Sequence, residues 1–139
     1  MFSVTVKYAI RACVFLFQNY NAGRYSGVKE ICKNAGTPTS YTSKILHILV
    51  KEGIVKSVKG HHGGYILAIP PEEISIKSLV IALEGPAMFT NCLLTTDGCQ
   101  HEEPCALHHV FLHLLQEVDR KLSTIKMDDA LFVPSAKGN

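Results

Sequence analysis

The sequence predicts a mainly α-helical fold with one small β-hairpin and a long C-terminal helix. Apolar residues recur every three or four positions in several stretches, which is the spacing of helices with one buried face. Two short alternating runs flank a glycine-rich segment, as the strands of a hairpin do. The last apolar stripe, from about Pro104 to Lys126, is longer than one small domain can cover.

The first two helices are predicted from apolar spacing and from their end signals. Helix one covers Thr5 to about Asn19, with apolar positions at steps of three and four: Val6, Ile10, Cys13, Val14 and Phe17. A short second helix covers Val28–Asn34, with Ser26 as its N-cap. Ala35-Gly36 ends it in a tight turn.

A third helix and the hairpin follow directly. Thr37 as N-cap and Pro38 at the first helical position predict a helix that runs to about Glu52, where Gly53 ends it. The strands are predicted at Ile54–Val58 and Tyr65–Ile69. The segment between them contains three glycines and three basic or titratable residues: Lys59, Gly60, His61, His62, Gly63 and Gly64.

The C-terminal half is predicted as a helix, a loop and a long helix. Ser75–Leu83 forms the first helix, 87–104 a loop with at most one helical turn, and Pro104–Lys126 the long helix. Residues from Met127 onward are expected to fray. The expected organisation is a DNA-binding domain at 1–85, a cysteine-containing loop at 86–104, a dimerisation helix at 105–127 and a flexible tail at 128–139.

Two short helices joined by a tight turn and followed by a two-stranded wing make the winged helix-turn-helix plan. The net charge is only +2, but its distribution is uneven. Nine Lys and Arg residues precede residue 61, against two acidic residues, Glu30 and Glu52. This asymmetry favours a double-stranded DNA partner for the first half of the chain.

The predicted DNA contacts lie at the start of the third helix and at the wing tip. A recognition helix enters the major groove with its N-terminal residues against bases and phosphates. Hydroxyls and cations suit that role, so the candidates are Thr39, Ser40, Tyr41, Ser43 and Lys44 from the helix, and Lys59, His61 and His62 from the wing. An ordinary solvated helix start and a plain glycine turn are the alternative interpretations.

These pieces resemble the Rrf2 family of bacterial transcriptional regulators, of the IscR and NsrR type. The matching segments are Tyr8-Ala9-Ile10-Arg11-Ala12, Ser40-Tyr41, Gly53-Ile54-Val55-Lys56-Ser57 and the wing sequence through Gly63-Gly64-Tyr65. The resemblance implies a homodimer that binds a pseudo-palindromic operator. This chain departs from the family pattern at two positions. It has Lys59 where the family often has Arg, and Thr42 where the family often has an apolar residue. Lysine at position 59 lacks the planar guanidinium group with which arginine donates paired hydrogen bonds.

Three cysteines of the predicted loop form the candidate metal site. Cys92, Cys99 and Cys105 are separated by six and five residues, and His108 lies one helical turn beyond Cys105. Thiolates are the usual ligands of iron–sulfur clusters, and imidazole can replace one of them. We therefore expect a [2Fe–2S] or [4Fe–4S] cluster that air exposure during purification can remove.

The resemblance supports the same ligands, because sensing members place three cysteines here and IscR-like members add a histidine that His108 matches. This chain has one extra residue between the first two cysteines. His101 and His109 are alternative ligands. Reversible thiol oxidation, zinc bound by the same residues, and inert packing are the other interpretations of the three cysteines. Cys13 and Cys32 are expected to be core residues.

The long last helix is predicted to pair with its copy in a homodimer, and Phe111→Asp with Leu115→Asp is expected to break that dimer. An enzyme is not expected, because the sequence has no oxyanion-hole motif, phosphate loop or helical His-Glu pair. A winged module that binds protein instead of DNA is a further alternative. No signal peptide or membrane span is predicted, so a cytoplasmic location is expected.

Overall fold

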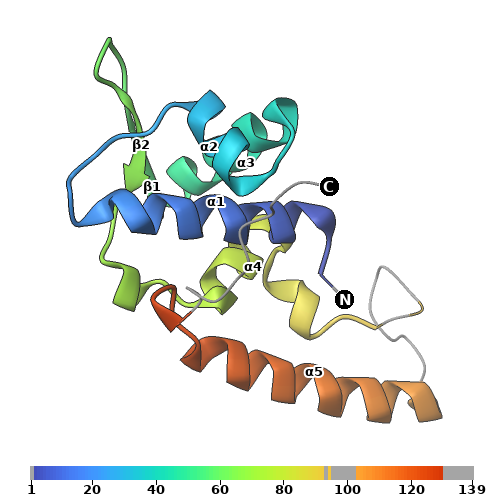
Figure 1. Cartoon of the computed structure of the whole chain (residues 1–139). Helices are drawn as coiled ribbons and strands as arrows, with labels where there is room; N and C mark the ends of the chain where they lie inside the picture. Colours follow the sequence, from blue (N-terminus) through green and yellow to red (C-terminus); the bar gives the residue numbers. More distant parts are fainter. Residues whose placement is uncertain (1, 93, 95–102, 130–139) are drawn as a thin grey trace.

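A computed structural model describes residues 2–92, 94 and 103–129 of the chain. Figure 1 shows α1 crossing the middle of the molecule, with α2 and α3 on one side, α4 on the other and the hairpin projecting from the body. The predicted mainly α fold with a small β wing is confirmed. The described elements are α1 (Val4–Tyr20), α2 (Val28–Ala35), α3 (Thr39–Lys51), β1 (Val55–Val58), β2 (Gly64–Leu67), the 3-10 helix η1 (Pro71–Glu73), α4 (Ile76–Glu84), the 3-10 helix η2 (Pro86–Phe89) and α5 (Ala106–Thr124).

Helix α1 forms the centre of the core. Ser3 caps its start, since the Ser3 Oγ accepts a hydrogen bond from the Val6 amide at 3.3 Å. The helix packs against α2, α3, α4 and β2. Of the five predicted apolar positions, Val6, Cys13 and Val14 are buried, whereas Ile10 and Phe17 are only partly buried. The other buried residues of the helix are Ala9, Ala12 and Leu16. Burying one such large aliphatic side chain contributes about 1.5–3 kcal/mol.

Helix α2 begins at Val28, as predicted, but its predicted cap is wrong. Gly27, and not Ser26, is the N-cap, and no side chain caps this helix. Ser26 is instead buried, and its backbone bonds to Tyr65 of β2 in both directions, at 2.9 Å and 2.8 Å. The predicted turn at Ala35-Gly36 is confirmed, because Gly36 adopts the left-handed conformation with φ 65°.

Helix α3 begins at Thr39, one residue later than predicted. Pro38 is the N-cap, and the Thr37 side chain caps nothing. Thr37 instead points inward, where its Oγ1 lies 2.6 Å from the Oγ1 of the buried Thr42. The Thr42 hydroxyl donates to the Pro38 carbonyl at 2.9 Å. The hydroxyl pair therefore ties the helix-turn-helix turn to α3 from the inside.

The wing is an antiparallel hairpin in which Val55 pairs with Leu67 and Val58 pairs with Gly64. Its strands are shorter than the predicted runs but lie within them, apart from Gly64. The bridge between Ser26 and Tyr65 adds a backbone partner on the outer edge of β2. An isolated two-stranded hairpin is marginally stable in water, so this third segment anchors the wing to the body.

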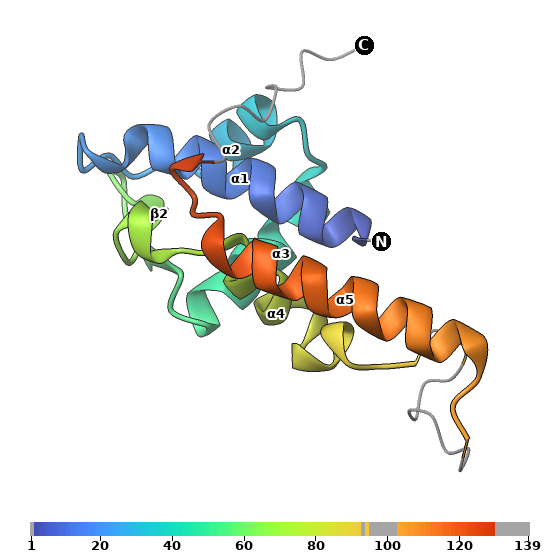
Figure 2. The same ribbon diagram turned by 90° about the horizontal axis from the view of Figure 1, so that it is seen from below.

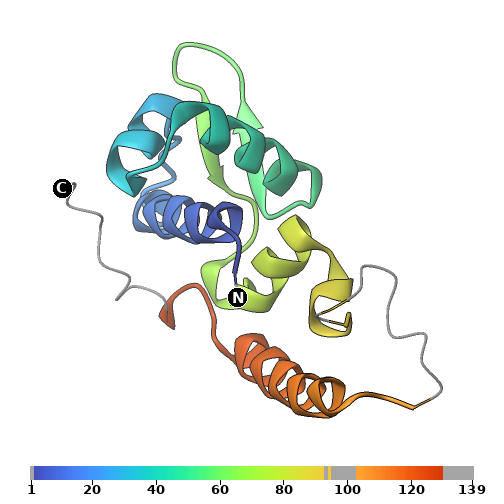
Figure 3. The same ribbon diagram turned by 90° about the vertical axis from the view of Figure 1, so that its right-hand side faces the viewer.

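Helix α5 lies along the outside of the molecule and packs mainly on α4 and η2 (Figures 2 and 3). Lys77 of α4 bonds to Asp119 of α5, with Nζ–Oδ distances of 2.7 and 3.0 Å. The Ile76 amide donates to the Ile125 carbonyl, and the Met127 amide donates to the Ile74 carbonyl, both at 2.9 Å. The C-terminal end of α5 is therefore bonded to the start of α4.

The prediction that the chain frays from Met127 onward is wrong at that residue. Met127 is completely buried and belongs to the core cluster. The rest of the predicted tail lies outside the described residues after Asp129. Among the described helices, none is both long and apolar enough to span a membrane.

Candidate DNA interface and cysteine site

The start of α3 presents the five predicted recognition residues to solvent. Thr39, Ser40, Ser43 and Lys44 are exposed, and the Tyr41 side chain is 50% exposed. Thr42, which interrupts this run, is buried in the turn. The free backbone N–H groups of the first helical turn add partial positive charge at the same place. The surface therefore combines hydroxyl donors, one cation and a helix N-terminus.

The wing tip presents the other predicted contacts. Lys59, His61 and His62 are all exposed, and the two imidazole rings meet edge to face with centroids 5.1 Å apart. Figure 1 shows this loop extending well beyond the body of the molecule. Gly60 has φ 116°, a conformation that other residues adopt only with strain. The wing thus carries positive or titratable groups on a projecting tip.

The two glycines before Tyr65 are required by close backbone approach. A Cβ atom at Gly63 would lie 2.1 Å from the Val58 carbonyl oxygen, inside the hairpin. A Cβ atom at Gly64 would lie 2.5 Å from the Ser26 carbonyl oxygen, and Gly64 has φ 136°. The Gly-Gly-Tyr sequence therefore closes the hairpin and also docks it against the segment before α2.

Sequence reasoning missed two residues of the same surface. His47 is exposed and lines one open groove of α3 together with Ser43, Lys44 and Ile48. Its position four residues after Ser43 and three after Lys44 was the available signal. Tyr8 of α1 contacts the Tyr41 ring, and no local pattern in the sequence indicates that contact.

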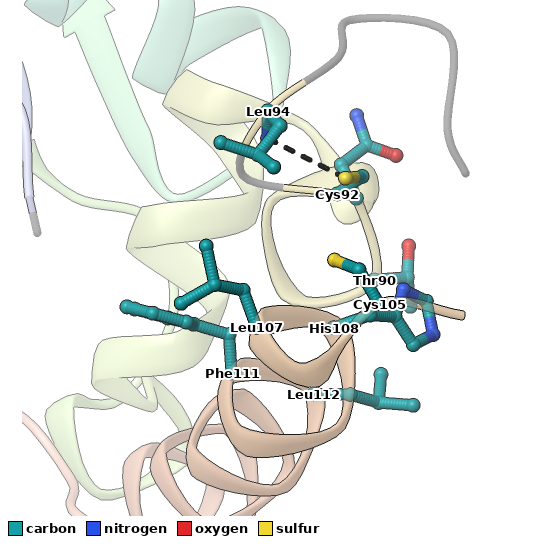
Figure 4. Close-up of a pocket in the computed structure, with 9 residues that line it drawn as sticks. Thr90, Cys92, Leu94, Cys105, Leu107, His108, Phe111 and Leu112 are labelled. Atoms are coloured by element: carbon teal, nitrogen blue, oxygen red, sulfur yellow. Dashed lines mark hydrogen bonds between the residues drawn. The ribbon is translucent and has the colours of Figure 1, made fainter.

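The cysteine site lies where η2 and the following segment meet the start of α5 (Figure 4). Cys92, Cys105 and His108 line one small cavity of about 20 Å³, together with largely apolar neighbours: Thr90, Asn91, Leu94, Leu107, Phe111 and Leu112. Cys105 is the N-cap of α5, and its carbonyl accepts from the His108 amide at 3.0 Å. The Cys92 sulfur accepts from the Leu94 amide at 3.4 Å. The structure thus brings three of the four predicted ligands to one cavity.

The donor chemistry of these three residues suits an iron–sulfur cluster, because thiolate and imidazole are its protein ligands. Cys99, the fourth predicted ligand, lies outside the described residues, as does His101. Within the described part of the chain, no three His, Cys, Asp or Glu side chains are already grouped closely enough to hold a metal ion. His109 is exposed and meets the His108 ring edge to face, with centroids 6.0 Å apart.

The two remaining cysteines are core residues, as predicted. Cys13 is completely buried in α1, and Cys32 is buried in α2. Burial raises the pKa of the Cys13 thiol from 9.0 to about 12, because the thiolate is poorly solvated there. Cys13 is therefore a protonated packing residue of the core at neutral pH.

Helix α5 buries none of its residues completely. Three large apolar side chains on one face stay about half exposed: Leu107 at 49%, Val110 at 58% and Leu114 at 52%. Phe111 and Leu115 are only partly exposed, because they face η2 across a groove that Met88 also lines. The helix therefore carries one apolar face toward its own domain and another toward solvent.

The sequence and the fold both match a known group of regulators. Residues 2–131 match the Rrf2 family, described as an iron-dependent transcriptional regulator. A relative from Aquifex aeolicus, named as an HTH-type transcriptional regulator, is 35% identical over 130 residues, which cover 91% of this chain and 89% of the relative. The HTH-type regulator IscR of Photorhabdus laumondii is 29% identical over 100 residues, covering 72% of this chain and 60% of that protein.

Two solved structures show the same fold. IscR of T. potens superimposes with a TM-score of 0.77 at 24% identity, and the match covers 100% of this chain and 92% of that one. CymR, the global cysteine regulator of B. subtilis, gives a TM-score of 0.76 at 22% identity, over 94% of this chain and 95% of that one. With its helix-turn-helix, its wing and a family match over nearly its whole length, this chain belongs to the Rrf2 family of DNA-binding transcriptional regulators.

Proposed function

We propose that the chain is a homodimeric, sequence-specific regulator whose affinity for its operator is controlled by an iron–sulfur cluster at Cys92, Cys99 and Cys105, with His108 as the fourth ligand. One observation carries the proposal. Cys92 follows η2 and Cys105 caps α5, yet their side chains and that of His108 line the same cavity. A cluster held there would supply a centre that responds to oxidants, nitric oxide or iron supply.

The chain's own residues link this site to the packing of α5 on α4 and η2. Cys105 and His108 belong to the first turn of α5, while Cys92 follows η2, which continues directly from α4. Lys77 of α4 bonds to Asp119 of α5, and its Nζ also lies 5.9 Å from the centroid of the Phe89 ring in η2. A cluster that draws Cys92 and Cys105 together would therefore change how α5 packs on α4 and η2.

In the proposed complex, α3 enters the major groove and the wing follows the adjacent backbone. Thr39, Ser40, Tyr41, Ser43 and Lys44 lie on the helix, and Lys59, His61 and His62 on the wing. Affinity for a cognate duplex is expected to fall steeply with salt, because each neutralised phosphate releases counterions. A mobility shift without salt dependence would argue against this binding mode.

The exposed face of α5 supports the homodimer. Leu107, Val110 and Leu114 lie at helical spacings of three and four, so they form one apolar stripe that a second copy of α5 could cover. Leu114→Asp tests this better than substitution of Phe111 or Leu115, because those two residues pack toward η2 within the monomer. Gln116→Asp, on the opposite side of α5, is the matched control.

Sedimentation of the two variants decides between a dimer and a monomer. We expect Leu114→Asp to sediment as a monomer with an unchanged circular dichroism spectrum, and Gln116→Asp to remain dimeric. An unchanged dimer in Leu114→Asp would show that this stripe is not the interface.

An anaerobic visible absorption spectrum, with iron and sulfide analysis, tests the cluster. The wild-type protein should be brown and contain both elements, and Cys99→Ala and Cys105→Ala should lose them. Cys32→Ala is the control, because that thiol is buried in α2 and should leave the spectrum unchanged. A protein that stays colourless after anaerobic reconstitution would contradict the cluster while leaving DNA binding intact.

The alternative is an Rrf2 regulator without a cluster, controlled by thiol oxidation or by a bound protein or small molecule. An open groove of about 630 Å³ beside Cys92 favours this second function, since Glu84, Met88, Asn91 and Phe111 also line it. It offers an apolar floor with a few polar groups, as small-molecule sites do. Mass spectrometry of peroxide-treated protein would show a disulfide among Cys92, Cys99 and Cys105 if thiol chemistry is the signal.

A further inference from the structure

The side chains of Tyr8 and Tyr41 form a contact between the central helix and the recognition helix. Their ring centroids are 5.9 Å apart and their planes make an angle of 79°, which is an edge-to-face arrangement. Tyr8 lies in the second turn of α1, is partly buried and packs against the core cluster. Tyr41 lies in the first turn of α3 and is 50% exposed.

The contact matters because an exposed tyrosine side chain without such a contact can rotate freely, and it would lose that conformational freedom when DNA binds. Fixing a mobile side chain when DNA arrives costs affinity, and a side chain that is already held avoids that cost. Among the described residues, none forms a hydrogen bond with the Tyr41 hydroxyl, whereas the Tyr8 ring contacts the Tyr41 ring. Thr42, the next residue, is fixed in the turn by its hydrogen bonds, so the backbone under Tyr41 is also held.

We propose that Tyr8 is a positioning residue for DNA recognition: it acts through Tyr41, holding that ring ready at the start of α3, and does not itself read the DNA. The proposal rests on the proposed role of Tyr41 at the interface. The aromatic ring of Tyr8, and not its hydroxyl, carries this positioning role, because an edge-to-face contact needs two rings but no hydroxyl.

The test uses the full-length protein and a duplex selected from random-sequence DNA by the wild-type protein. Tyr8→Met keeps an apolar side chain of similar length and removes the ring, and it should weaken binding about 3–10-fold, the range expected for loss of one aromatic pair. Tyr8→Phe keeps the ring and should bind like wild type. The salt dependence should stay unchanged in both, because neither substitution removes a phosphate contact.

The double variant separates positioning from direct contact. In a Tyr41→Met background, Tyr8→Met should cause no further loss, because its effect passes through the Tyr41 ring. Tyr20→Met is the control, since Tyr20 is another partly buried tyrosine of α1 that packs against the core. It should lower the melting temperature without changing the affinity for the duplex.

Several outcomes would overturn the proposal. These are an unchanged affinity in Tyr8→Met, an equal loss in the Tyr41→Met background, or a loss in Tyr8→Phe as large as in Tyr8→Met. If Tyr8→Met fails to fold, nuclear Overhauser contacts between the two rings in the wild-type protein give the second test, and their absence would also refute it. If Tyr41→Met binds normally, the positioning role fails, while salt-sensitive binding by the wild type would still support DNA-binding function.

Discussion

Replacing Gly64 by alanine should detach the wing from the body of the protein. The new Cβ would lie 2.5 Å from the Ser26 carbonyl oxygen and 2.7 Å from its carbonyl carbon. Both are backbone atoms, so no side-chain rotation can relieve the collision. The Ser26 segment and β2 would have to separate, which breaks or lengthens the two backbone hydrogen bonds between Ser26 and Tyr65.

The expected cost has two parts. Alanine at φ 136° costs about 1–3 kcal/mol in backbone strain. Loss of the two hydrogen bonds adds about 1–3 kcal/mol, at roughly 0.5–1.5 kcal/mol for each. The free energy of unfolding should therefore fall by about 2–6 kcal/mol, a large fraction of the total stability of about 5–15 kcal/mol that small proteins have.

Gly60→Ala is the matched control for the strain. Gly60 is also a wing glycine with a positive φ, at 116°, but no atom lies within 4 Å of the position its Cβ would occupy. It should show the strain cost alone. Urea unfolding of both variants measures the difference, which should be about 1–3 kcal/mol larger for Gly64→Ala. Equal losses of stability in the two variants would refute the collision argument.

Four further predictions concern buried side chains and the reactivity of the cysteines. Thr42→Val should lower stability by about 1–3 kcal/mol, because it leaves the buried Thr37 hydroxyl unpaired; the double variant with Thr37→Val should recover part of that loss in urea unfolding, and no recovery would contradict the coupling. Iodoacetamide at pH 8 should modify Cys105 but not Cys13 in the native protein, since the raised pKa of Cys13 keeps its thiol protonated, and equal native rates would argue otherwise. The sign of that shift also means that the folded state loses stability as the pH rises from 9.0 toward 12, which unfolding curves across this range can check. Met127→Ala should cost about 2–5 kcal/mol, because the side chain is completely buried, and a cost within experimental error would mean that this residue is not part of the core.

The sequence pattern predicts the order and type of the elements because each amphipathic helix carries its own apolar spacing. The errors lie where a long-range contact overrides a local signal. Thr37 has the sequence context of an N-cap, but its hydroxyl pairs with Thr42 inside the turn. Ser26 also has the context of a cap, but its backbone pairs with Tyr65. Met127 follows the end of the helical pattern, but its side chain is completely buried and its amide donates to the Ile74 carbonyl.

In the candidate site, too, the sequence predicts the local relationships between residues but not the long-range contacts. Cys105 and His108 share one helical turn, so their proximity follows from spacing alone. Cys92 reaches the same cavity only because η2 and α5 pack together, which no periodicity in the sequence shows. The Tyr8–Tyr41 contact joins helices that are distant along the chain, so it was equally invisible before the structure.

Helix α5 is hydrogen-bonded to the rest of the domain near its C-terminal end, so a rotation about that end moves its other end farthest. The helix has 19 residues and is therefore about 28 Å long. Its C-terminal end is bonded to α4 through Asp119 and through the backbone around Met127, whereas Cys105 lies at the opposite end. Rotation about the bonded end moves the Cys105 end by about 0.5 Å per degree for a helix of this length. A displacement of about 3 Å between the thiols of Cys92 and Cys105 therefore corresponds to about 6° of rotation, and in the proposed dimer both DNA-binding halves would turn by such an angle relative to the shared helices.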